Sequence, residues 1–248
     1  MKHVALAGAT TGIGLALARE YARAGWRVAL LGRDPERLES AVASARSVSP
    51  GEVVVGVLWD ATDPRRTGPA LDEAARALGQ IDLVVYVAGL MVGGGDPDRR
   101  GEAAAEMMDV NALGAIRLIE HAADYMVLAG RGRIAAIGSI AGDRGRKGNP
   151  AYGASKAALD AYLEGLRHRL HGTGVGVSTV KPGFVKTRML PKDQRAFPPA
   201  ISAEDAASRI VRGLDRGRDV FYVPGWWGLI SWALRVTPRS LFKRIAPP

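Results

Sequence analysis

The chain has 248 residues, a formal net charge of +9 and no cysteine. Its length suits one α/β domain with a sizeable core, and the absence of cysteine excludes disulfide bonds and thiol catalysis. Its basic residues are dispersed and form no nucleic-acid-binding motif, so we expect anionic small molecules or anionic lipid rather than nucleic acid as partners. The four histidines do not cluster, so no metal site is expected: His3, His121, His168 and His171.

Short apolar runs alternate with helical patterns along the whole chain. Strands are predicted near residues 3–8, 26–31, 52–58, 81–87, 132–138, 175–181 and 219–223. Helices are predicted near residues 13–24, 35–46, 66–78, 102–129, 151–171 and 203–216. This alternation predicts an α/β fold with a doubly wound parallel sheet of about seven strands. Because the N-terminus enters a strand directly, we expect no secretory signal and a cytoplasmic protein.

A glycine-rich turn follows the first predicted strand, with the spacing G-x-x-x-G-x-G. The order of strand, glycine turn and helix is typical of the pyrophosphate site in a Rossmann-type sheet. The glycines allow the backbone to approach the pyrophosphate, and the helix N-terminus favours its negative charge. Many glycine turns are only tight turns, so this motif alone is weak. Its candidate cofactor residues are Gly8, Thr10, Thr11, Gly12, Ile13 and Gly14.

A phenol, an amine and a hydroxyl are spaced for chemistry in the second half of the chain. Tyr152 and Lys156 are four residues apart, so they share one face of a predicted helix, and Ser139 lies thirteen positions upstream of Tyr152. A lysine ammonium beside a phenol lowers the pKa of the tyrosine, which then suits a general acid or base. A chance Y-x-x-x-K and a turn serine are the alternatives for each motif alone.

Together these motifs resemble the short-chain dehydrogenase/reductase family, and the similarity extends from Lys2 to about Arg188. The resemblance implies hydride transfer between nicotinamide and a carbonyl or secondary alcohol. It implies that Tyr152 exchanges the proton, that Ser139 polarises the carbonyl oxygen and that Lys156 holds the nicotinamide ribose. It further implies that Asn111 anchors a water in a proton relay with Lys156; the alternative is a helix amide bonded only to backbone.

The same resemblance assigns further cofactor contacts after the later strands. Thr187 is implied to meet the nicotinamide carboxamide, and Asp60 to lie near the adenine. Two positions depart from the family pattern, Ala7 before the glycine turn and Val87 in place of an asparagine, and both are expected to support the sheet and the turn. The implied contacts beyond the glycine turn are Asp60, Ala61, Ala88, Gly89, Asn111, Tyr152, Lys156, Pro182, Gly183, Val185 and Thr187.

The end of the second predicted strand indicates which cofactor is preferred. An acidic residue there would bind the ribose hydroxyls of NAD, but this chain has Gly32 followed by Arg33. A guanidinium at this position can pair with the 2′-phosphate of NADP, so NADP is expected and NAD is less favoured. The alternative is that Arg33 is only solvated and that Asp34 binds the ribose. Thr11 stands where related enzymes often have a second basic residue, which suggests a modest preference.

Two segments are candidates for substrate contact. Residues 186–200 are expected to form a lid, in which Met189, Leu190 and Phe197 either contact an apolar substrate or pack the lid onto the body. Between Ser139 and Tyr152, three cations either meet a substrate phosphate or are solvated: Arg144, Arg146 and Lys147.

The C-terminal residues 224–248 are predicted to be a helical extension of the same domain, which otherwise spans residues 1–223. Residues 226–236 are apolar and hold three of the five tryptophans, but they are too few to span a bilayer. Thr237 is predicted to cap a further helix with Pro238 in its first turn. No acidic residue follows Asp219, and tryptophans beside arginine and lysine suit a membrane interface.

Two other roles for this extension remain open, a cover for the substrate pocket and a subunit interface. Members of the family commonly form homodimers or homotetramers. The extension also resembles that of the decaprenylphosphoryl 2-keto-pentose reductases, which implies a small-molecule or lipid-linked substrate and peripheral contact with the cytoplasmic side of a membrane. The alternative function for the whole chain is a cofactor-binding sensor of the same fold without turnover.

Overall fold

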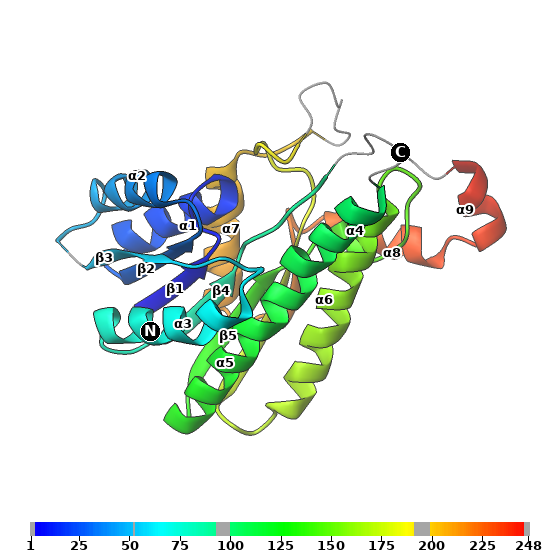
Figure 1. Ribbon diagram of the computed structural model, residues 1–248. Coiled ribbons are helices and arrows are strands. Elements are labelled where there is room, and N and C mark those ends of the chain that lie inside the picture. The colour runs from blue at the N-terminus through cyan, green and yellow to red at the C-terminus, as the bar shows by residue number, and fades with distance from the viewer. Residues whose placement is uncertain (1–2, 52, 93–99, 191–198, 246–248) are drawn as a thin grey trace.

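In the computed structural model, which describes residues 3–51, 53–92, 100–190 and 199–245, seven parallel strands form one sheet (Figure 1). Its spatial order is β3-β2-β1-β4-β5-β6-β7. The winding of the chain therefore reverses between β1 and β4, where sheets of this type bind ligands. The predicted doubly wound sheet is confirmed, with β1 (His3–Ala7), β2 (Arg27–Gly32), β3 (Val54–Leu58), β4 (Leu83–Tyr86), β5 (Gly132–Ile137), β6 (Val175–Pro182) and β7 (Val220–Val223).

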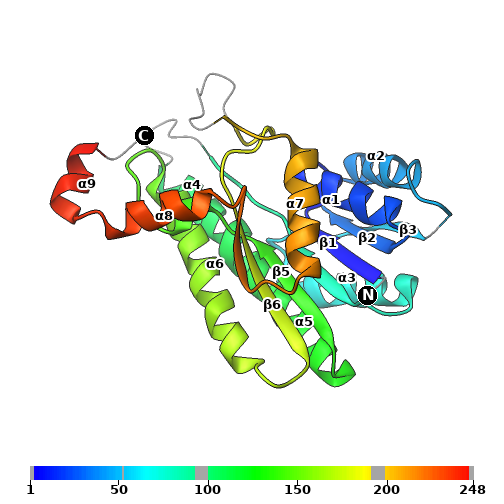
Figure 2. The same ribbon diagram turned by 180° about the vertical axis from the view of Figure 1, so that it is seen from behind.

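Helices cover both faces of this sheet. Helices α1, α2 and α7 lie on one face and α3, α5 and α6 on the other (Figures 1 and 2). The helices are α1 (Gly12–Arg23), α2 (Pro35–Arg46), α3 (Pro64–Leu78), α4 (Arg100–Met108), α5 (Gly114–Ala129), α6 (Pro150–Arg169), α7 (Ala203–Asp215), α8 (Trp227–Val236) and α9 (Arg239–Ile245). Together with the sheet they make the three-layer arrangement that the alternating pattern predicts.

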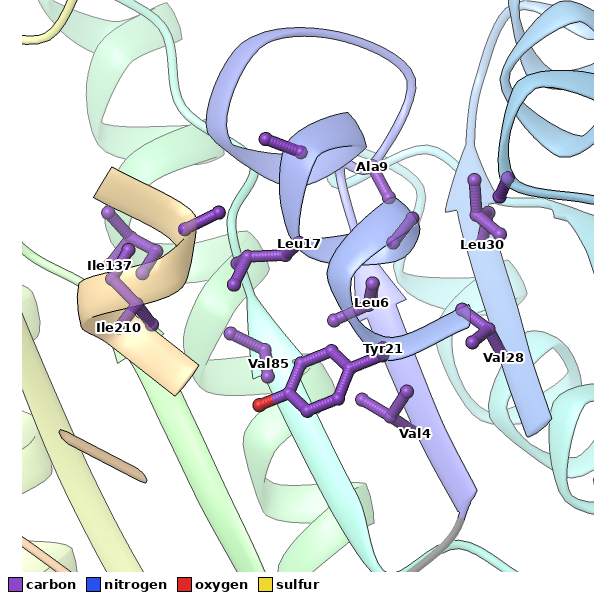
Figure 3. Packing of buried hydrophobic residues seen from close by; sticks show 14 of the residues in the cluster. Val4, Leu6, Ala9, Leu17, Tyr21, Val28, Leu30, Val85, Ile137 and Ile210 are labelled. Carbon is purple, nitrogen blue, oxygen red and sulfur yellow. The ribbon is translucent and has the colours of Figure 1, made fainter. Parts of the chain in front are cut away.

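Each face of the sheet carries its own apolar core, because successive residues of a strand point to opposite faces. In β1, Val4 and Leu6 belong to the core under α1 and α7, whereas Ala5 belongs to the core under α3, α5 and α6. Leu17 of α1 and Ile210 of α7 meet over the first core (Figure 3). Both cores hold the carboxyl ends of the strands rigidly, and these ends position the functional residues.

The predicted helix over residues 102–129 is corrected by the structure. A π-helical turn, Asp109–Leu113, separates α4 from α5. Within it the carbonyl of Val110 accepts a hydrogen bond from Tyr86 Oη at 2.5 Å. At Gly114 a Cβ would lie 2.6 Å from the carbonyl oxygen of Ala61, so only glycine fits where α5 begins. A π turn adds one residue to a helical turn and shifts the face on which Asn111 lies.

The C-terminal extension forms two short helices, α8 and α9, beside the end of α6 that begins at Pro150 (Figures 1 and 2). We propose that residues 224–248 belong to the same domain as residues 1–223, because Trp227 and Ser231 of α8 are buried against it. The predicted capping role of Thr237 is wrong. Its hydroxyl donates back to the carbonyl of Ala233 at 2.7 Å, so Thr237 closes α8 instead of opening α9.

Candidate active site

A cavity of about 830 Å³ lies at the carboxyl ends of the six strands β1 to β6. Ser139 lines it, together with every predicted cofactor residue except Asn111. These cofactor residues are Gly8, Thr10, Thr11, Gly12, Ile13, Gly14, Arg33, Asp60, Ala61, Ala88, Gly89, Tyr152, Lys156, Pro182, Gly183, Val185 and Thr187. Residues that are up to 179 positions apart in the sequence therefore share one space, which is large enough for a drug-sized ligand.

The glycine turn lies between β1 and α1, and contacts with neighbouring backbone explain its glycines. Gly8 has φ +88°, and a Cβ there would lie 2.4 Å from the backbone nitrogen of Ala88. A Cβ at Gly14 would lie 2.5 Å from the carbonyl oxygen of Gly8. Thr11, the N-cap of α1, gives the helix no side-chain cap, so the first N–H groups of α1 remain available to an anion. The turn fits the pyrophosphate of a dinucleotide.

The far end of the cavity is built from the ends of β2 and β3. Arg33 lines the cavity directly after Gly32, where a Cβ would lie 2.6 Å from Thr10 Cγ2. Asp34 does not line it. Its carboxylate instead caps α2 by accepting from the backbone N–H of Arg37 at 3.1 Å. Asp60 lines the cavity, and its Oδ1 accepts from the N–H and the hydroxyl of Thr62.

Helix α6 presents Tyr152 and Lys156 to the cavity. Asn149 caps this helix by accepting from the backbone N–H of Tyr152 at 3.0 Å, with Pro150 in the first turn. Lys156 is fully enclosed, and its Nζ donates to the carbonyl of Ile137 at 2.9 Å. Ser139 accepts from the N–H of Ala141 at 3.1 Å, which fixes its hydroxyl over the short 3-10 turn Ile140–Gly142. The fold thus brings the three predicted catalytic residues, Ser139, Tyr152 and Lys156, together around one cavity.

The predicted direction of the Tyr152 pKa shift is corrected. Burial raises the pKa of Tyr152, and only the hydrogen bond with Ser139 opposes this rise. Lys156 Nζ lies 5.9 Å from the centre of the Tyr152 ring and is not among the causes of the shift. Burial in turn lowers the pKa of Lys156 to about 8, although the Asp160 carboxylate partly raises it. A lysine that loses its charge this readily is a poor stabiliser of a phenolate.

Asn111 lies behind the cavity and is completely buried. Its Oδ1 accepts from the N–H of Leu90 at 2.7 Å, and its Nδ2 donates to the carbonyl of Leu90 at 2.8 Å and to Ser155 Oγ at 2.9 Å. The side chain therefore ties the segment after β4 to α6. Its implied role in a water relay stays a prediction.

The substrate end of the cavity is mainly apolar. Met189 and Leu190 line the cavity, and Met189 Sδ is 4.0 Å from Tyr152 Oη. Their contact with a substrate stays a prediction. Arg146 lines it too, and its Nε is buried without a hydrogen-bond partner among the described residues. Phe197, which was expected either to contact substrate or to pack the lid onto the body, lies outside the described residues.

Several residues that line the cavity were not predicted from the sequence, including Met91, Asn149 and Phe184. Each lies within three positions of a predicted residue, at Gly89, Tyr152 or Gly183. The only feature of the sequence that could have indicated these residues is their position next to a motif. Apolar and amide side chains are common throughout a folded chain, so their residue type alone does not mark a site.

Comparison with known proteins places the chain in a family. The profile described as short chain dehydrogenase matches residues 2–196. An uncharacterized oxidoreductase of Mycobacterium tuberculosis is 33% identical over 248 residues, which cover 98% of this chain and 96% of that protein. The chain therefore belongs to the short-chain dehydrogenase family, as its motifs indicated, and is an oxidoreductase of that family.

Solved structures share the fold over most of the chain. A short-chain dehydrogenase from Sphingobium yanoikuyae in complex with NADPH has a TM-score of 0.81 and 27% identity, covering 94% of this chain and 93% of that one. A short-chain dehydrogenase/reductase from Burkholderia phymatum in complex with NAD has a TM-score of 0.81 and 24% identity, with coverage of 92% and 91%. At 24% identity, the similarity to the Burkholderia phymatum protein shows a shared fold and nothing further.

Two further features concern the part of the chain that the structure describes. No helix there is both long and apolar enough to cross a membrane. No three histidine, aspartate or glutamate side chains there gather as a metal site.

Proposed function

We propose that this protein is an NADP-dependent oxidoreductase that transfers hydride between nicotinamide and a carbonyl compound or secondary alcohol. The observation that carries the proposal is the shared cavity, which is lined both by the glycine turn and by Ser139, Tyr152 and Lys156. Family membership supports the same reaction class. A nicotinamide dinucleotide fits the turn, because the glycines leave the backbone open to a pyrophosphate.

Nicotinamide, when bound, supplies or accepts the hydride. In the reducing direction the carbonyl oxygen gains negative charge and needs a proton, which the Tyr152 phenol donates. The Ser139 hydroxyl donates a hydrogen bond to the same oxygen and polarises the carbonyl. The raised pKa of Tyr152 keeps it protonated at neutral pH, so it is ready to act as the acid. Lys156 holds the nicotinamide ribose and Asn111 fixes the segment that faces it.

The preference for NADP rests on the end of β2. Arg33 lines the cavity there, and a guanidinium can bind a 2′-phosphate through two hydrogen bonds. Asp34, the residue that would favour NAD, is engaged by Arg37 and lies outside the cavity lining. The complexes of similar proteins include both cofactors, NADPH in one and NAD in another. Because Arg33 lines the cavity and Asp34 does not, NAD is the less favoured cofactor.

The end of the cavity near Met189 and Arg146 fits a substrate that is apolar and carries an anionic group. A carbonyl compound linked to a lipid phosphate has both properties. Leu90, Met189 and Leu190 give this end apolar walls, and Arg146, whose Nε is buried without a partner among the described residues, also lines the cavity from the loop before α6. A buried guanidinium nitrogen without a partner is costly, and a phosphate oxygen would satisfy it. The resemblance to the decaprenylphosphoryl 2-keto-pentose reductases supports the same substrate class.

A second cavity of about 690 Å³ lies between the loop after Ser139 and the C-terminal helices. Four of the residues that line it are cations: Arg144, Arg235, Arg239 and Lys243. Exposed apolar side chains of α8, its N-cap residue and α9 accompany this basic cavity: Trp226, Leu229, Trp232, Val236 and Leu241. This combination supports peripheral contact with an anionic membrane surface through residues 224–248. That the enzyme is cytoplasmic and forms a homodimer or homotetramer stays a prediction from the family resemblance.

Replacing Tyr152 with Phe tests the reaction class. We expect Tyr152→Phe to bind NADPH normally but to lose carbonyl reduction about 10²–10⁴-fold, the range for removal of a general acid. NADPH consumption is followed by absorbance against a panel of long-chain and isoprenoid ketones and aldehydes, and NADPH binding is followed by fluorescence.

The matched control is Tyr162→Phe on the same helix, whose hydroxyl donates to Glu120 away from the cavity. It should keep the wild-type rate. Equal rates for wild type and Tyr152→Phe would refute the assigned acid. NADPH binding by the wild type without reduction of any carbonyl would favour the alternative, a sensor without turnover.

A further inference from the structure

A buried charge network lies behind the loop that carries Ser139. Lys181 Nζ is 2.5 Å from Asp143 Oδ1 and 2.8 Å from Asp160 Oδ2. The three side chains are at most 15% exposed, and none of them lines the large cavity. Lys181 donates a hydrogen bond to Asp143 and forms an ion pair with Asp160. Breaking a buried ion pair is costly, so these groups hold β6, α6 and the loop in one arrangement.

Helix α8 joins the same network. Ser231 Oγ donates to Asp143 Oδ2 at 2.5 Å, and Tyr222 Oη of β7 donates to the same oxygen at 3.1 Å. Ser231 is 1% exposed, so this hydrogen bond is shielded from water. Asp143 is therefore bound from three elements, β6, β7 and α8.

The next residue of the loop binds the end of α8. Arg144 Nη1 donates to the main-chain carbonyls of Leu234 and Thr237, and its guanidinium lies 4.0 Å from the ring centre of Phe242 in α9. The last carbonyls of a helix lack intrahelical partners and favour a cation. Arg144 satisfies them and fastens both C-terminal helices to the loop.

A third contact connects α8 to the cofactor side of the cavity. Trp227 packs edge-on against Phe184, with ring centres 5.4 Å apart. A Cβ at Gly183 would lie 1.8 Å from Trp227 Nε1, so the indole lies directly on this glycine. Helix α8 thus touches the loops on both sides of the cavity.

The network is also close to the catalytic groups along the chain. Asp143 follows the 3-10 turn that begins after Ser139, and Asp160 lies one helical turn after Lys156. A Cβ at Gly138 would lie 2.7 Å from Asp160 Oδ1, so the residue before Ser139 rests on this carboxylate. The loop is therefore held from both of its ends.

We propose that Asp143, Arg144 and Lys181 are positioning residues through which the C-terminal helix α8 holds Ser139 in place for hydride transfer. The coupling between α8 and the loop follows from the contacts above, whereas its effect on catalysis rests on the proposed function. Coupling between two sites is reciprocal. A partner that binds the outer face of α8 is therefore expected to change the stability of the loop that carries Ser139.

The first test measures hydrogen–deuterium exchange of the full chain with bound NADPH. Ser231→Ala removes one hydrogen bond to Asp143 from the side of α8. We expect exchange at residues 140–149 to rise about three- to tenfold, as loss of one such bond predicts. Leu229→Ser is the matched control on α8, because Leu229 is 75% exposed, and it should leave these residues unchanged. Equal exchange at residues 140–149 in wild type and Ser231→Ala would overturn the coupling.

The second test separates positioning from simple stability. Lys181→Met and Ser231→Ala should lower kcat at least fivefold while the KM for NADPH stays within twofold, and Lys181→Arg should restore most of kcat. An unchanged kcat in folded Lys181→Met would overturn the positioning role. If the wild type reduces no carbonyl, the oxidoreductase proposal fails, and the exchange experiment still decides the coupling.

Discussion

At the scale of single residues, we propose that Arg33 carries the preference for NADP. It lines the cavity directly after Gly32, a position where a side chain would collide with Thr10. We expect Arg33→Ala to weaken NADPH binding about 10–100-fold, as the loss of a charge-assisted bidentate contact of 1.5–3 kcal/mol implies. NADH binding should change less than twofold. Fluorescence titration with both cofactors measures the difference.

Arg37→Ala is the control for this prediction. Arg37 is a cation four residues further on, more than half exposed and paired with Asp34. Its removal should leave the ratio of the two affinities unchanged. A parallel loss of NADPH and NADH affinity in Arg33→Ala would remove the argument for NADP.

Most candidate site residues could be predicted, because their motifs join a residue type to a fixed spacing. Tyr152 and Lys156 share a helix face by spacing alone, and Gly8 and Gly14 follow a strand. The pKa direction of Tyr152 could not be predicted, because it depends on how deeply the phenol is buried. Arg146 could be noticed, but its unpaired nitrogen appears only once the loop is folded.

At the scale of elements, the outer face of α8 is the feature that needs a partner. Leu229, Trp232 and Val236 lie on one side of the helix and are 75%, 65% and 57% exposed. Trp227 and Ser231 on the opposite side are buried, so this exposure does not come from a loosely attached helix. Apolar and aromatic residues flanked by cations suit the interface of an anionic bilayer.

We expect the full chain to co-sediment with vesicles containing phosphatidylglycerol and not with vesicles of phosphatidylcholine alone. The double variant Leu229→Ser/Trp232→Ser should lose vesicle binding at least tenfold, because each side chain contributes about 1.5–3 kcal/mol on burial. Substitution is preferred to truncation because α8 also holds the loop through Ser231.

Leu128→Ser is the control for this experiment. Leu128 is 89% exposed and lies in the last turn of α5. The labelled helices α5 and α8 run apart at this end of α5 (Figures 1 and 2). It should leave vesicle binding unchanged. Binding that survives in the α8 variant would argue against membrane contact and would favour a subunit interface or a pocket cover.

The helices and strands could be predicted from the hydrophobic periodicity of the sequence, with two exceptions. The π turn at Asp109–Leu113 interrupts a continuous helical pattern, because local packing of Gly114 on Ala61 decides it and no residue type marks it. Threonine is a common N-cap residue, but the hydroxyl of Thr237 donates a hydrogen bond to the carbonyl of Ala233 in the preceding helix. In both places a tertiary or competing local contact outweighed the sequence pattern.

At the scale of the whole molecule, buried titratable groups make stability depend on pH. Burial lowers the pKa of Lys156 from 10.5 to about 8. Between these values the unfolded chain binds a proton that the folded chain has lost, so stability rises with pH. We expect the free energy of unfolding of the cofactor-free chain to increase by about 2 kcal/mol between pH 7.5 and 9.5, at about 1.4 kcal/mol per pKa unit.

At higher pH the slope of stability against pH changes sign. Burial raises the pKa of Tyr21, Tyr86 and Tyr162, so the unfolded chain loses phenolic protons that the folded chain keeps. Stability then falls as pH rises, and a maximum is expected between pH 9 and 10.

Urea unfolding at half-unit steps from pH 7.5 to 10.5 measures the curve. Lys156→Met should abolish the rise, whereas Lys147→Met, on an exposed loop position, should keep it. A flat curve for the wild type would mean that Lys156 keeps its proton in the folded chain, and its amine would then be a stronger electrostatic partner for Tyr152 than its burial implies.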